Sequence, residues 1–306
     1  MISDFKKVCA IVVLYNPDLI VLHRLLKSVI NQVGQVRLVD NTPDVELAKM
    51  DSEFSHYGAS LSYEPFNENH GIAYAQNRGI DYAKNNNFSH VLLLDQDSEL
   101  PAFMTEKLLE AEKELLKNDV KVAAVGPSFI DEKSGHIGPA VCVKFFRIKR
   151  IPITEDIPYF KSDYIIASGS LIRLSILDVT GVMDEKLFID WVDIEWGERC
   201  SKLGYDSFIV SSVQMKHSIG DSYVQFLGRN INLHSDFRNY FIVRNASYLL
   251  FRNNLKFKSK FLLIVKIPYY IIMFSYLSKR KLYSVSLLTK AFLDGVVGRM
   301  YKGYFK

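Results

Sequence analysis

Over the first 126 residues, short runs rich in β-branched side chains alternate with longer stretches of helical character. The strand-like runs are 8–15, 35–40, 60–64, 90–95 and 121–126. The helical stretches between them cover about 19–33, 44–55, 72–86 and 102–117, and Pro43 and Pro101 stand where proline is tolerated in a first helical turn. This alternation predicts an α/β fold in which a mostly parallel central sheet is flanked by helices.

The pattern changes after residue 126, where shorter strand-like pieces with turn residues follow. One clear helix is expected near 193–203, ended by Gly204 and supported by Glu195 and Arg199 one helical turn apart. From about residue 234 the pattern is helical, basic and aromatic. The sequence therefore predicts an α/β body of about 1–228 followed by a C-terminal helical extension, 229–306.

The charge of the chain is divided unevenly between these two parts. Residues 229–306 contain 15 Lys and Arg against Asp236 and Asp294 alone, a net charge of +13, whereas the whole chain carries only +4. A basic, aromatic tail on an acidic body indicates an anionic partner for the tail. Its apolar stretch 261–277 contains Lys266 and Pro268 and is short for a spanning helix, so we expect a helix at an anionic membrane surface or one packed on the body.

The strongest single motif is an apolar strand that runs directly into Asp95-Gln96-Asp97. Magnesium and manganese ions prefer oxygen ligands and are often held by one or two carboxylates together with substrate phosphates. A turn that closes a strand would also use Asp and Ser at these positions. Polar residues also end the first two strands, at Tyr15 and Asp40, and ligands bind at that edge of open α/β sheets.

Several competing classes of protein lack support in this sequence. It contains no G-x-G-x-x-G after a strand, no phosphate-binding G-x-x-x-x-G-K-[ST] and no G-x-S-x-G elbow. The three cysteines (Cys9, Cys142 and Cys200) are far apart, which excludes a disulfide framework and fits a reducing cytoplasm. A nicotinamide-dependent oxidoreductase, a P-loop NTPase and a serine hydrolase are therefore not expected, and neither is a nucleic-acid partner.

Taken in order, the motifs resemble those of family 2 glycosyltransferases, which have the GT-A fold. They are VVLYNP at 12–17, Asp40 at the end of the second strand, NHGIAYAQNRGI at 69–80, DQDS at 95–98, ASGS at 167–170, FIDWVDIEW at 188–196 and HSIGD at 217–221. The last four are similar to those of bacterial rhamnosyltransferases. The resemblance covers about residues 8–250 and implies a catalytic domain over 1–228, with a nucleotide-binding half of about 1–126 and an acceptor half of about 127–228.

The resemblance implies how a nucleotide-sugar donor, with dTDP-rhamnose favoured, would be bound. Asp40 would accept a hydrogen bond from N3–H of thymine or uracil. Tyr15 and Asn69 would line the nucleoside, Gly71 would belong to the same donor site, and Asp95 would lie near the ribose. A turn residue before Thr42 is the structural alternative for Asp40.

The same resemblance implies the residues around the diphosphate. Asp97 would bind the divalent cation, Mg²⁺ or Mn²⁺, and His217 matches a family position that contacts metal or diphosphate. Arg238 and Arg244 would contact the diphosphate, because a guanidinium can bond two phosphate oxygens at once. A structural histidine and a solvated basic helix face are the alternatives for His217 and for the two arginines.

On the acceptor side, the resemblance implies that Asp193 is the general base of an inverting displacement and that Asp190, Trp191 and Ser168 contact the acceptor. A helix N-cap is the alternative for Asp193, and Asp190 and Glu195 are the nearest competing carboxylates. The family's usual Glu-Asp pair is Val192-Asp193 here, so the glutamate is missing.

The expected function is therefore rhamnosyl transfer to a polysaccharide or lipid-linked oligosaccharide, on the cytoplasmic side of the cell membrane. Transfer of another hexose from a UDP- or dTDP-sugar is the alternative within the fold. A metal-dependent nucleotidyltransferase would also use paired carboxylates, but Tyr15-Asn16-Pro17-Asp18 is not the basic, glycine-rich loop that it needs. A non-catalytic binding module is a third class, and the sequence leaves the oligomeric state open.

Overall fold

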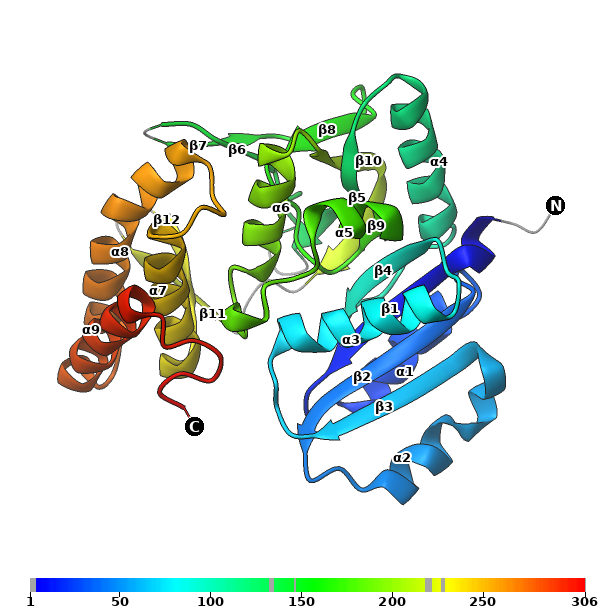
Figure 1. Cartoon of the computed structure of the whole chain (residues 1–306), viewed down its shortest axis with the longest axis horizontal. Helices are drawn as coiled ribbons and strands as arrows, with labels where there is room; N and C mark the ends of the chain where they lie inside the picture. The colour runs from blue at the N-terminus through cyan, green and yellow to red at the C-terminus, as the bar shows by residue number, and fades with distance from the viewer. Residues whose placement is uncertain (1–3, 132–134, 146, 218–221, 227–228, 306) are drawn as a thin grey trace.

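A computed structural model of the chain describes residues 4–131, 135–145, 147–217, 222–226 and 229–305. At 47, 48, 51, 131, 217, 222–226 and 229–233 it describes the backbone alone. The expected α/β architecture is present: an eight-stranded sheet is flanked by helices, and helices follow at the C-terminal end (Figure 1).

The N-terminal half of the sheet is parallel and is built from β1 (Val8–Leu14), β2 (Gln35–Pro43), β3 (Leu61–Asn67) and β4 (His90–Asp95). The helices between these strands are α1 (Leu19–Val29), α2 (Leu47–Phe54) and α3 (Ile72–Asn85), with α4 (Met104–Lys117) after β4. Short 3₁₀ turns cover Asp4–Lys7, Ser55–Ser60 and Glu185–Leu187. Because β1 lies between β2 and β4 and is buried, its side chains form an almost unbroken apolar run.

Two boundaries differ from the expectation from the sequence. Pro43 ends β2, where it lies opposite Asn67 of β3, and α2 begins only at Leu47. Pro101 likewise lies before α4 and not in its first turn, because Phe103 has a left-handed backbone (φ 60°) and the helix starts at Met104. A residue with positive φ cannot belong to a right-handed helix.

The second half of the sheet is mixed, in the strand order β3-β2-β1-β4-β9-β5-β10-β8. β9 (Ser170–Arg173) is antiparallel to β4 and to β5 (Val122–Asp131), while β10 (Asp206–His217) is parallel to β5 and antiparallel to β8 (Tyr159–Ser162). Helices α5 (Leu174–Thr180) and α6 (Val192–Lys202) belong to this half. Two hairpins, β6 (Ala140–Val143) with β7 (Ile148–Ile151) and β11 (Ser222–Phe226) with β12 (Arg229–Leu233), lie outside the main sheet.

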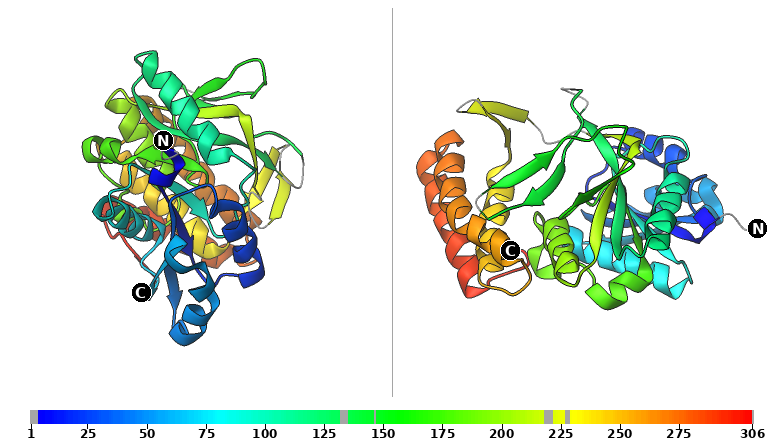
Figure 2. Two further views of the ribbon diagram at one scale, coloured as in Figure 1. Left: turned by 90° about the vertical axis from the view of Figure 1, so that its right-hand side faces the viewer. Right: turned by 90° about the horizontal axis from the view of Figure 1, so that it is seen from above.

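The C-terminal region forms three helices, α7 (Asp236–Leu250), α8 (Phe257–Leu277) and α9 (Lys281–Val297), which pack on one another. Figure 2 shows them at one end of the molecule, beside α6 and the β6–β7 hairpin. Apolar side chains of these helices, among them Phe241, Leu263 and Leu288, share one buried cluster with Trp196 of α6 and Ile11 of β1. The extension is therefore joined to the body by a continuous core.

Candidate active site

The carboxyl ends of β1, β2 and β4 meet at one edge of the sheet and are tied together by polar contacts. The backbone N–H of Tyr15 donates to Oε1 of Gln96 at 2.8 Å, and Nε2 of Gln96 donates to the Tyr15 carbonyl at 3.3 Å. The N–H of Asn16 donates to Oγ1 of Thr42 at 2.7 Å. The Asp-Gln-Asp turn after β4 is thus held against the end of β1, which in turn is held against the end of β2.

A pocket of about 320 Å³ opens beside Asp40 at this edge. The Asp40 carboxylate is fully buried and accepts hydrogen bonds from the N–H of Thr42 and the hydroxyl of Tyr63, both at 2.8 Å. Asn16 lines the same pocket, whereas Tyr15 stands outside it with half of its surface exposed. A fixed, buried acceptor in a pocket wall is the arrangement that a base N–H donor requires.

The loop before α3 is organised by amide side chains. The N–H of Gly71 donates to Oδ1 of Asn69 at 2.9 Å, and its carbonyl accepts from Nδ2 of Asn41 at 3.1 Å. Gly71 is buried with φ 89°, and a Cβ added there would lie 2.5 Å from the Phe188 carbonyl oxygen. Gly71 therefore allows α3 to approach the loop before α6.

The two aspartates of the turn after β4 differ in exposure. Asp97 is exposed, and its carboxylate has no hydrogen-bond or ion-pair partner among the described residues, while Asp95 is partly buried. Within the described part of the chain, no group of three or more His, Cys, Asp or Glu side chains is placed so that it could hold a metal ion by itself. An ion held by Asp97 would consequently take its other ligands from substrate phosphates, from water or from undescribed residues, a coordination that suits Mg²⁺ or Mn²⁺.

Ser168 takes a different role from the one expected. Its side chain is 1% exposed, and its hydroxyl shares a 2.6 Å hydrogen bond with that of Ser98, which directly follows Asp97. The next residue, Gly169, donates its N–H to the Leu93 carbonyl of β4 at 2.7 Å. Ser168 therefore supports the Asp-Gln-Asp turn from behind, and burial keeps it from contacting an acceptor. His217 ends β10, but its side chain and residues 218–221 lie outside the described residues.

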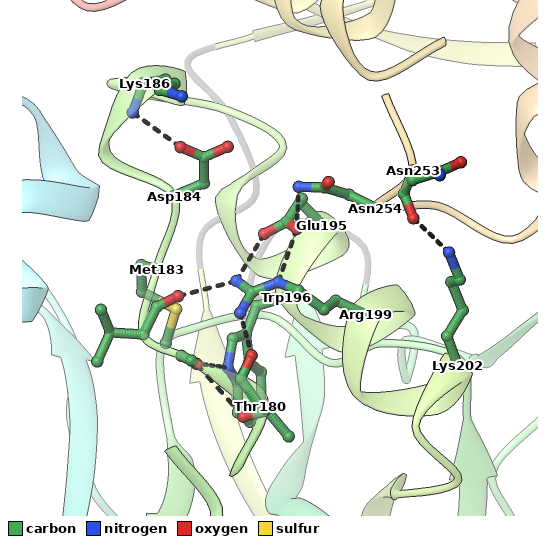
Figure 3. A network of polar contacts seen from close by, with 12 residues as sticks. Thr180, Met183, Asp184, Lys186, Glu195, Trp196, Arg199, Lys202, Asn253 and Asn254 are labelled. Carbon is green, nitrogen blue, oxygen red and sulfur yellow. Dashed lines mark hydrogen bonds and ion pairs between the residues drawn. The ribbon is translucent and has the colours of Figure 1, made fainter. Parts of the chain in front are cut away.

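Three carboxylates lie close together at the start of α6, and two of them are neutralised by arginine. Asp190 pairs with the guanidinium of Arg238, whose Nη2 lies 2.6 Å from Oδ1. Glu195 is fully buried and binds Arg199 through both oxygens, at 2.8 and 2.9 Å (Figure 3). Arg199 also bonds the carbonyls of Thr180 and Val182, so this pair anchors α6 to the loop after α5.

Asp193 lies between these two pairs and has no cationic partner among the described residues. Its Oδ1 accepts the N–H of Ile194 at 2.8 Å. The pKa of the Asp193 carboxyl is raised from 3.8 to about 6, chiefly by burial and in smaller part by the neighbouring charges of Asp190 and Asp95. Asp193 also lines a small cavity with Leu93 of β4, so it lies near the end of the strand that carries the Asp-Gln-Asp turn.

The loop that leads into α6 has an unusual backbone, because Phe188, Asp190 and Trp191 all have positive φ. Its carbonyls are held by α7: Nδ2 of Asn245 lies 2.9, 2.8 and 2.9 Å from the carbonyl oxygens of Leu187, Ile189 and Asp190. Backbone strain of this kind persists only where the surroundings impose it. Asn245 was not among the residues singled out from the sequence, where it reads as an ordinary helical position.

Arg244, the neighbour of Asn245, is likewise structural, and the expectation that it contacts a diphosphate is wrong. Its side chain is fully buried. The guanidinium donates to the carbonyls of Tyr301 (2.6 Å) and Leu187 (2.8 Å) and to Oδ1 of Asn245 (2.9 Å). With its donors used inside the protein, Arg244 cannot reach phosphate oxygens. Arg238 alone of the two arginines borders the site.

A second pocket, of about 280 Å³, lies between α6, the β6–β7 hairpin and α8. Asp190 and Trp191 line it, together with Tyr164. The indole N–H of Trp191 donates to the Ile242 carbonyl of α7 at 3.1 Å, which fixes the ring in the pocket wall. Two of the three residues expected to contact an acceptor therefore share one cavity next to Asp193.

Helix α8 turns one face to this pocket and leaves large apolar side chains exposed elsewhere. Phe257, Ile264 and Ile272 are 74, 56 and 71% exposed, and Val265 and Tyr276 are also exposed. By length and composition this helix of 21 residues could cross a membrane, with 28% of its most apolar window buried in the protein. Core helices of soluble proteins can have the same length and apolar composition, so these two properties alone do not identify a spanning segment.

Comparisons with known proteins agree with the sequence motifs. Residues 9–181 match the sequence profile described as Glycosyl transferase family 2. The chain is 33% identical over 250 residues, 81% of each protein, to the dTDP-rhamnosyl transferase RfbF of Shigella flexneri.

Solved glycosyltransferase structures share the fold at low sequence identity. The crystal structure of GalNAc-T7 with UDP, GalNAc and Mn²⁺ superposes with a TM-score of 0.58 at 16% identity, covering 78% of this chain and 51% of that one. TarS of S. aureus (residues 1–349) gives 0.56 at 14% identity, covering 95% and 81%. The mannosyltransferase PcManGT of Pyrobaculum calidifontis, solved with GDP-Man and Mn²⁺, gives 0.54 at 14% identity, covering 95% and 75%.

Proposed function

This chain belongs to glycosyl transferase family 2 and has the GT-A fold, and we propose that it transfers L-rhamnose from dTDP-β-L-rhamnose to a glycan or lipid-linked glycan. The choice of sugar rests on the likeness to the dTDP-rhamnosyl transferase of Shigella flexneri. The mechanism rests on one observation: the partly buried Asp193 carboxylate lies between two arginine-neutralised carboxylates and has no cationic partner in the part of the chain that the structure describes.

In the proposed donor site the thymine base enters the pocket beside Asp40. The buried carboxylate keeps lone pairs free after its bonds to Thr42 and Tyr63, and N3–H of the base would donate to one of them. Tyr15 and Asn69 would border the nucleoside, and Asp95 would bond the ribose. Arg238, at the edge of the site, would approach the diphosphate.

The exposed Asp97 carboxylate fits a divalent cation, Mg²⁺ or Mn²⁺, held jointly with the donor diphosphate. Two structural relatives were solved with Mn²⁺ and a nucleotide or nucleotide sugar. Such an ion supplies Lewis-acid stabilisation of the negative charge on the departing diphosphate. Gln96 and the Ser98–Ser168 hydrogen bond would hold the turn that presents Asp97.

In the proposed reaction Asp193 acts as the base. An acceptor hydroxyl oxygen forms a bond to C1 of rhamnose while the bond from C1 to the phosphate oxygen breaks, and dTDP leaves with the electron pair. The hydroxyl proton passes to the Asp193 carboxylate. Displacement on the face opposite the leaving group converts the β-linked donor into an α-linked product. A pKa of about 6 leaves the base ionised at neutral pH yet basic enough to accept the proton.

Binding to the cytoplasmic face of a membrane is part of the proposal, because the acceptor is expected there. Support comes from the exposed apolar side chains of α8 and from the excess of lysine and arginine after residue 229. Exposed aliphatic and aromatic residues flanked by basic ones are typical of helices that lie in the interface of an anionic leaflet.

The experiment that tests the sugar is a calorimetric titration with dTDP-L-rhamnose, UDP-glucose, UDP-GlcNAc and GDP-mannose, each with Mn²⁺ or Mg²⁺, followed by NMR of the product formed with the preferred donor. We expect dTDP-L-rhamnose to bind most tightly and to give an α-linked product. Tighter binding of a UDP- or GDP-sugar would refute the choice of donor, and a β-linked rhamnoside would refute the inverting mechanism.

A further inference from the structure

The pocket between α6, the β6–β7 hairpin and α8 is lined by two cationic side chains that the protein does not neutralise. Arg150 of β7 is exposed at its rim, and Lys266 of α8 is partly buried. Neither side chain forms an ion pair or hydrogen bond within the described residues. Burial and the nearby Arg150 charge both lower the pKa of Lys266. Two cations that destabilise each other in one cavity favour an anion between them.

The carboxylates that line the same pocket are already engaged. Glu198 accepts the hydroxyl of Ser259 at 2.7 Å and the N–H of Lys256 at 3.1 Å. Asp190 is paired with Arg238. The neutral donors on Glu198 do not cancel its charge, but Arg150 and Lys266 together outnumber this one carboxylate without an ion pair, so the cavity keeps a net positive charge.

The pocket adjoins the proposed base. Tyr164 lines it, and burial together with the neighbouring Asp193 charge raises the pKa of that phenol, so Asp193 lies near this wall of the pocket. Ile194, next to Asp193, is also part of the wall. An acceptor seated here could present a hydroxyl to Asp193, with its sugar ring against Trp191.

The remaining wall is apolar and comes largely from Leu262 and Leu263 of α8, Leu255 and Ile148 of β7. This combination of hydrocarbon and unpaired cations suits a ligand that carries an anionic group next to an apolar or sugar moiety. A phosphate group can accept hydrogen bonds from both cations, and a guanidinium and an ammonium are both common phosphate ligands.

We propose that this pocket is an acceptor subsite in which Arg150 and Lys266 bind a phosphate group of the glycan acceptor. The proposal deepens the glycosyl transfer proposed above and rests on it. The phosphate belongs either to the diphosphate of a lipid-linked glycan or to a phosphate substituent on a soluble one, and in both cases the recognised chemistry is the same.

The test measures binding directly, so it does not depend on turnover or on the donor sugar. Decyl phosphate, inorganic phosphate and the neutral decyl β-glucoside are titrated calorimetrically into the full chain, with EDTA present so that no metal draws phosphate to the donor site. Arg150→Gln is compared with Lys149→Gln, the neighbour on the same strand outside the pocket, and Lys266→Gln with Lys260→Gln on the same helix. Each pair loses the same charge from the same element.

We expect decyl phosphate to bind at least fivefold more weakly to Arg150→Gln and to Lys266→Gln than to their controls, since a hydrogen bond to a charged group is typically worth tenfold or more. The glucoside affinity and the melting temperature should be unchanged, which excludes misfolding. A smaller effect than fivefold, or an equal effect in the controls, overturns the proposal. Preference for decyl phosphate over inorganic phosphate identifies a lipid-linked source, and equal affinity identifies a soluble one.

The two proposals fail separately in this design. If the donor titration finds no nucleotide-sugar binding while phosphate binding depends on Lys266, the glycosyl transfer proposal is refuted and the phosphate site is supported. If dTDP-rhamnose binds and phosphate binding is the same in all variants, the phosphate subsite is refuted alone.

Discussion

The side-chain amide of Asn245 lies 2.9 Å from the carbonyl oxygen of Asp190, three residues before the carboxylate proposed as base. The same amide lies within 2.9 Å of two more carbonyls of that loop, and Arg244 adds a further bond to the Leu187 carbonyl. Helix α7 of the C-terminal extension thus determines the path of the chain into α6. The extension is therefore part of the machinery that positions Asp193.

The first prediction concerns this contact. Asn245→Ala should lower the free energy of unfolding by about 2–4 kcal/mol, since the Ile189 and Asp190 carbonyls lose the Asn245 amide as donor, whereas the Leu187 carbonyl keeps its bond from Arg244. It should also lower kcat about tenfold or more, because a displaced loop misplaces the base. Denaturant titration and steady-state kinetics measure the two effects.

Asn239→Ala is the matched control on the same helix. Asn239 is also buried, but its amide bonds only the His234 carbonyl, at 3.2 Å, outside the loop. We expect a stability loss of about 1 kcal/mol and unchanged kcat. If both variants reduced kcat equally, the effect would be general to α7 and the positioning role of Asn245 would be refuted.

The second prediction is a pH dependence. Because the pKa of Asp193 is raised to about 6 and the base must be ionised, kcat/KM for the donor should fall about tenfold for each pH unit below 6 and be level above it. Asp190→Asn should move the fall in kcat/KM to lower pH. The substitution removes a negative charge that raises the pKa of Asp193 and leaves the Arg238 cation without its partner carboxylate. A profile that is flat between pH 5 and 7 would contradict the assignment.

The third prediction concerns the metal. Calorimetry should show dTDP binding to the wild type about tenfold or more tightly with Mn²⁺ than with EDTA, and Asp97→Asn should remove that difference. Glu99→Gln is the control, an exposed carboxylate two residues along the chain. Equal nucleotide affinity with and without metal in the wild type would remove the metal role.

The strands and helices of the first half could be predicted because the signals are local. Buried parallel strands such as β1 are continuous apolar runs, and the helices begin and end near the residues expected. The order of the acidic motifs indicated which strand ends carry the proposed site. These features need no knowledge of which distant segments pack together.

Roles decided by long-range packing could not be predicted in this way. Ser168 is buried by Ser98, 70 residues away, and Arg244 is satisfied by the carbonyl of Tyr301, 57 residues away. Helical spacing indicates that Arg238 and Arg244 are on one helix, but their environments depend on the position of the C-terminal segment. The resemblance to a family indicates which residue types stand at which positions. It does not indicate that Ser168 would bond Ser98 or that Arg244 would bond the Tyr301 carbonyl.

The fourth prediction tests the membrane surface. Replacing Ile264 and Ile272 with serine should weaken binding to vesicles that contain anionic lipid, because both side chains are mostly exposed on α8. Val179→Ser, at an exposed apolar position on α5, is the control. Flotation of the wild type that is independent of anionic lipid and of salt would contradict an electrostatic interfacial helix.

The final prediction separates function from stability at Asp193. Asp193→Asn should keep donor affinity but lower turnover by about 10²–10⁴, which equals about 3–5.5 kcal/mol of activation free energy. If Asp190→Asn abolished turnover while Asp193→Asn stayed near the wild type, Asp190 would be the base instead.

The same substitution should stabilise the fold at neutral pH. A carboxyl whose pKa is 3.8 when unfolded and about 6 when folded binds its proton more tightly in the native state, so stability is lost as pH rises from 3.8 to 6. Above pH 6 the ionised Asp193 costs about 1–3 kcal/mol. Asparagine removes this cost, so Asp193→Asn should melt higher than the wild type at pH 7.5 and nearly equally at pH 4. Glu195→Gln, two residues along α6, should destabilise by about 2–4 kcal/mol, since it leaves the partly buried Arg199 without its ion pair. A higher melting temperature for Asp193→Asn together with a lower one for Glu195→Gln would support a catalytic role for Asp193. A lower melting temperature for Asp193→Asn would mean that Asp193, like Glu195, stabilises the fold.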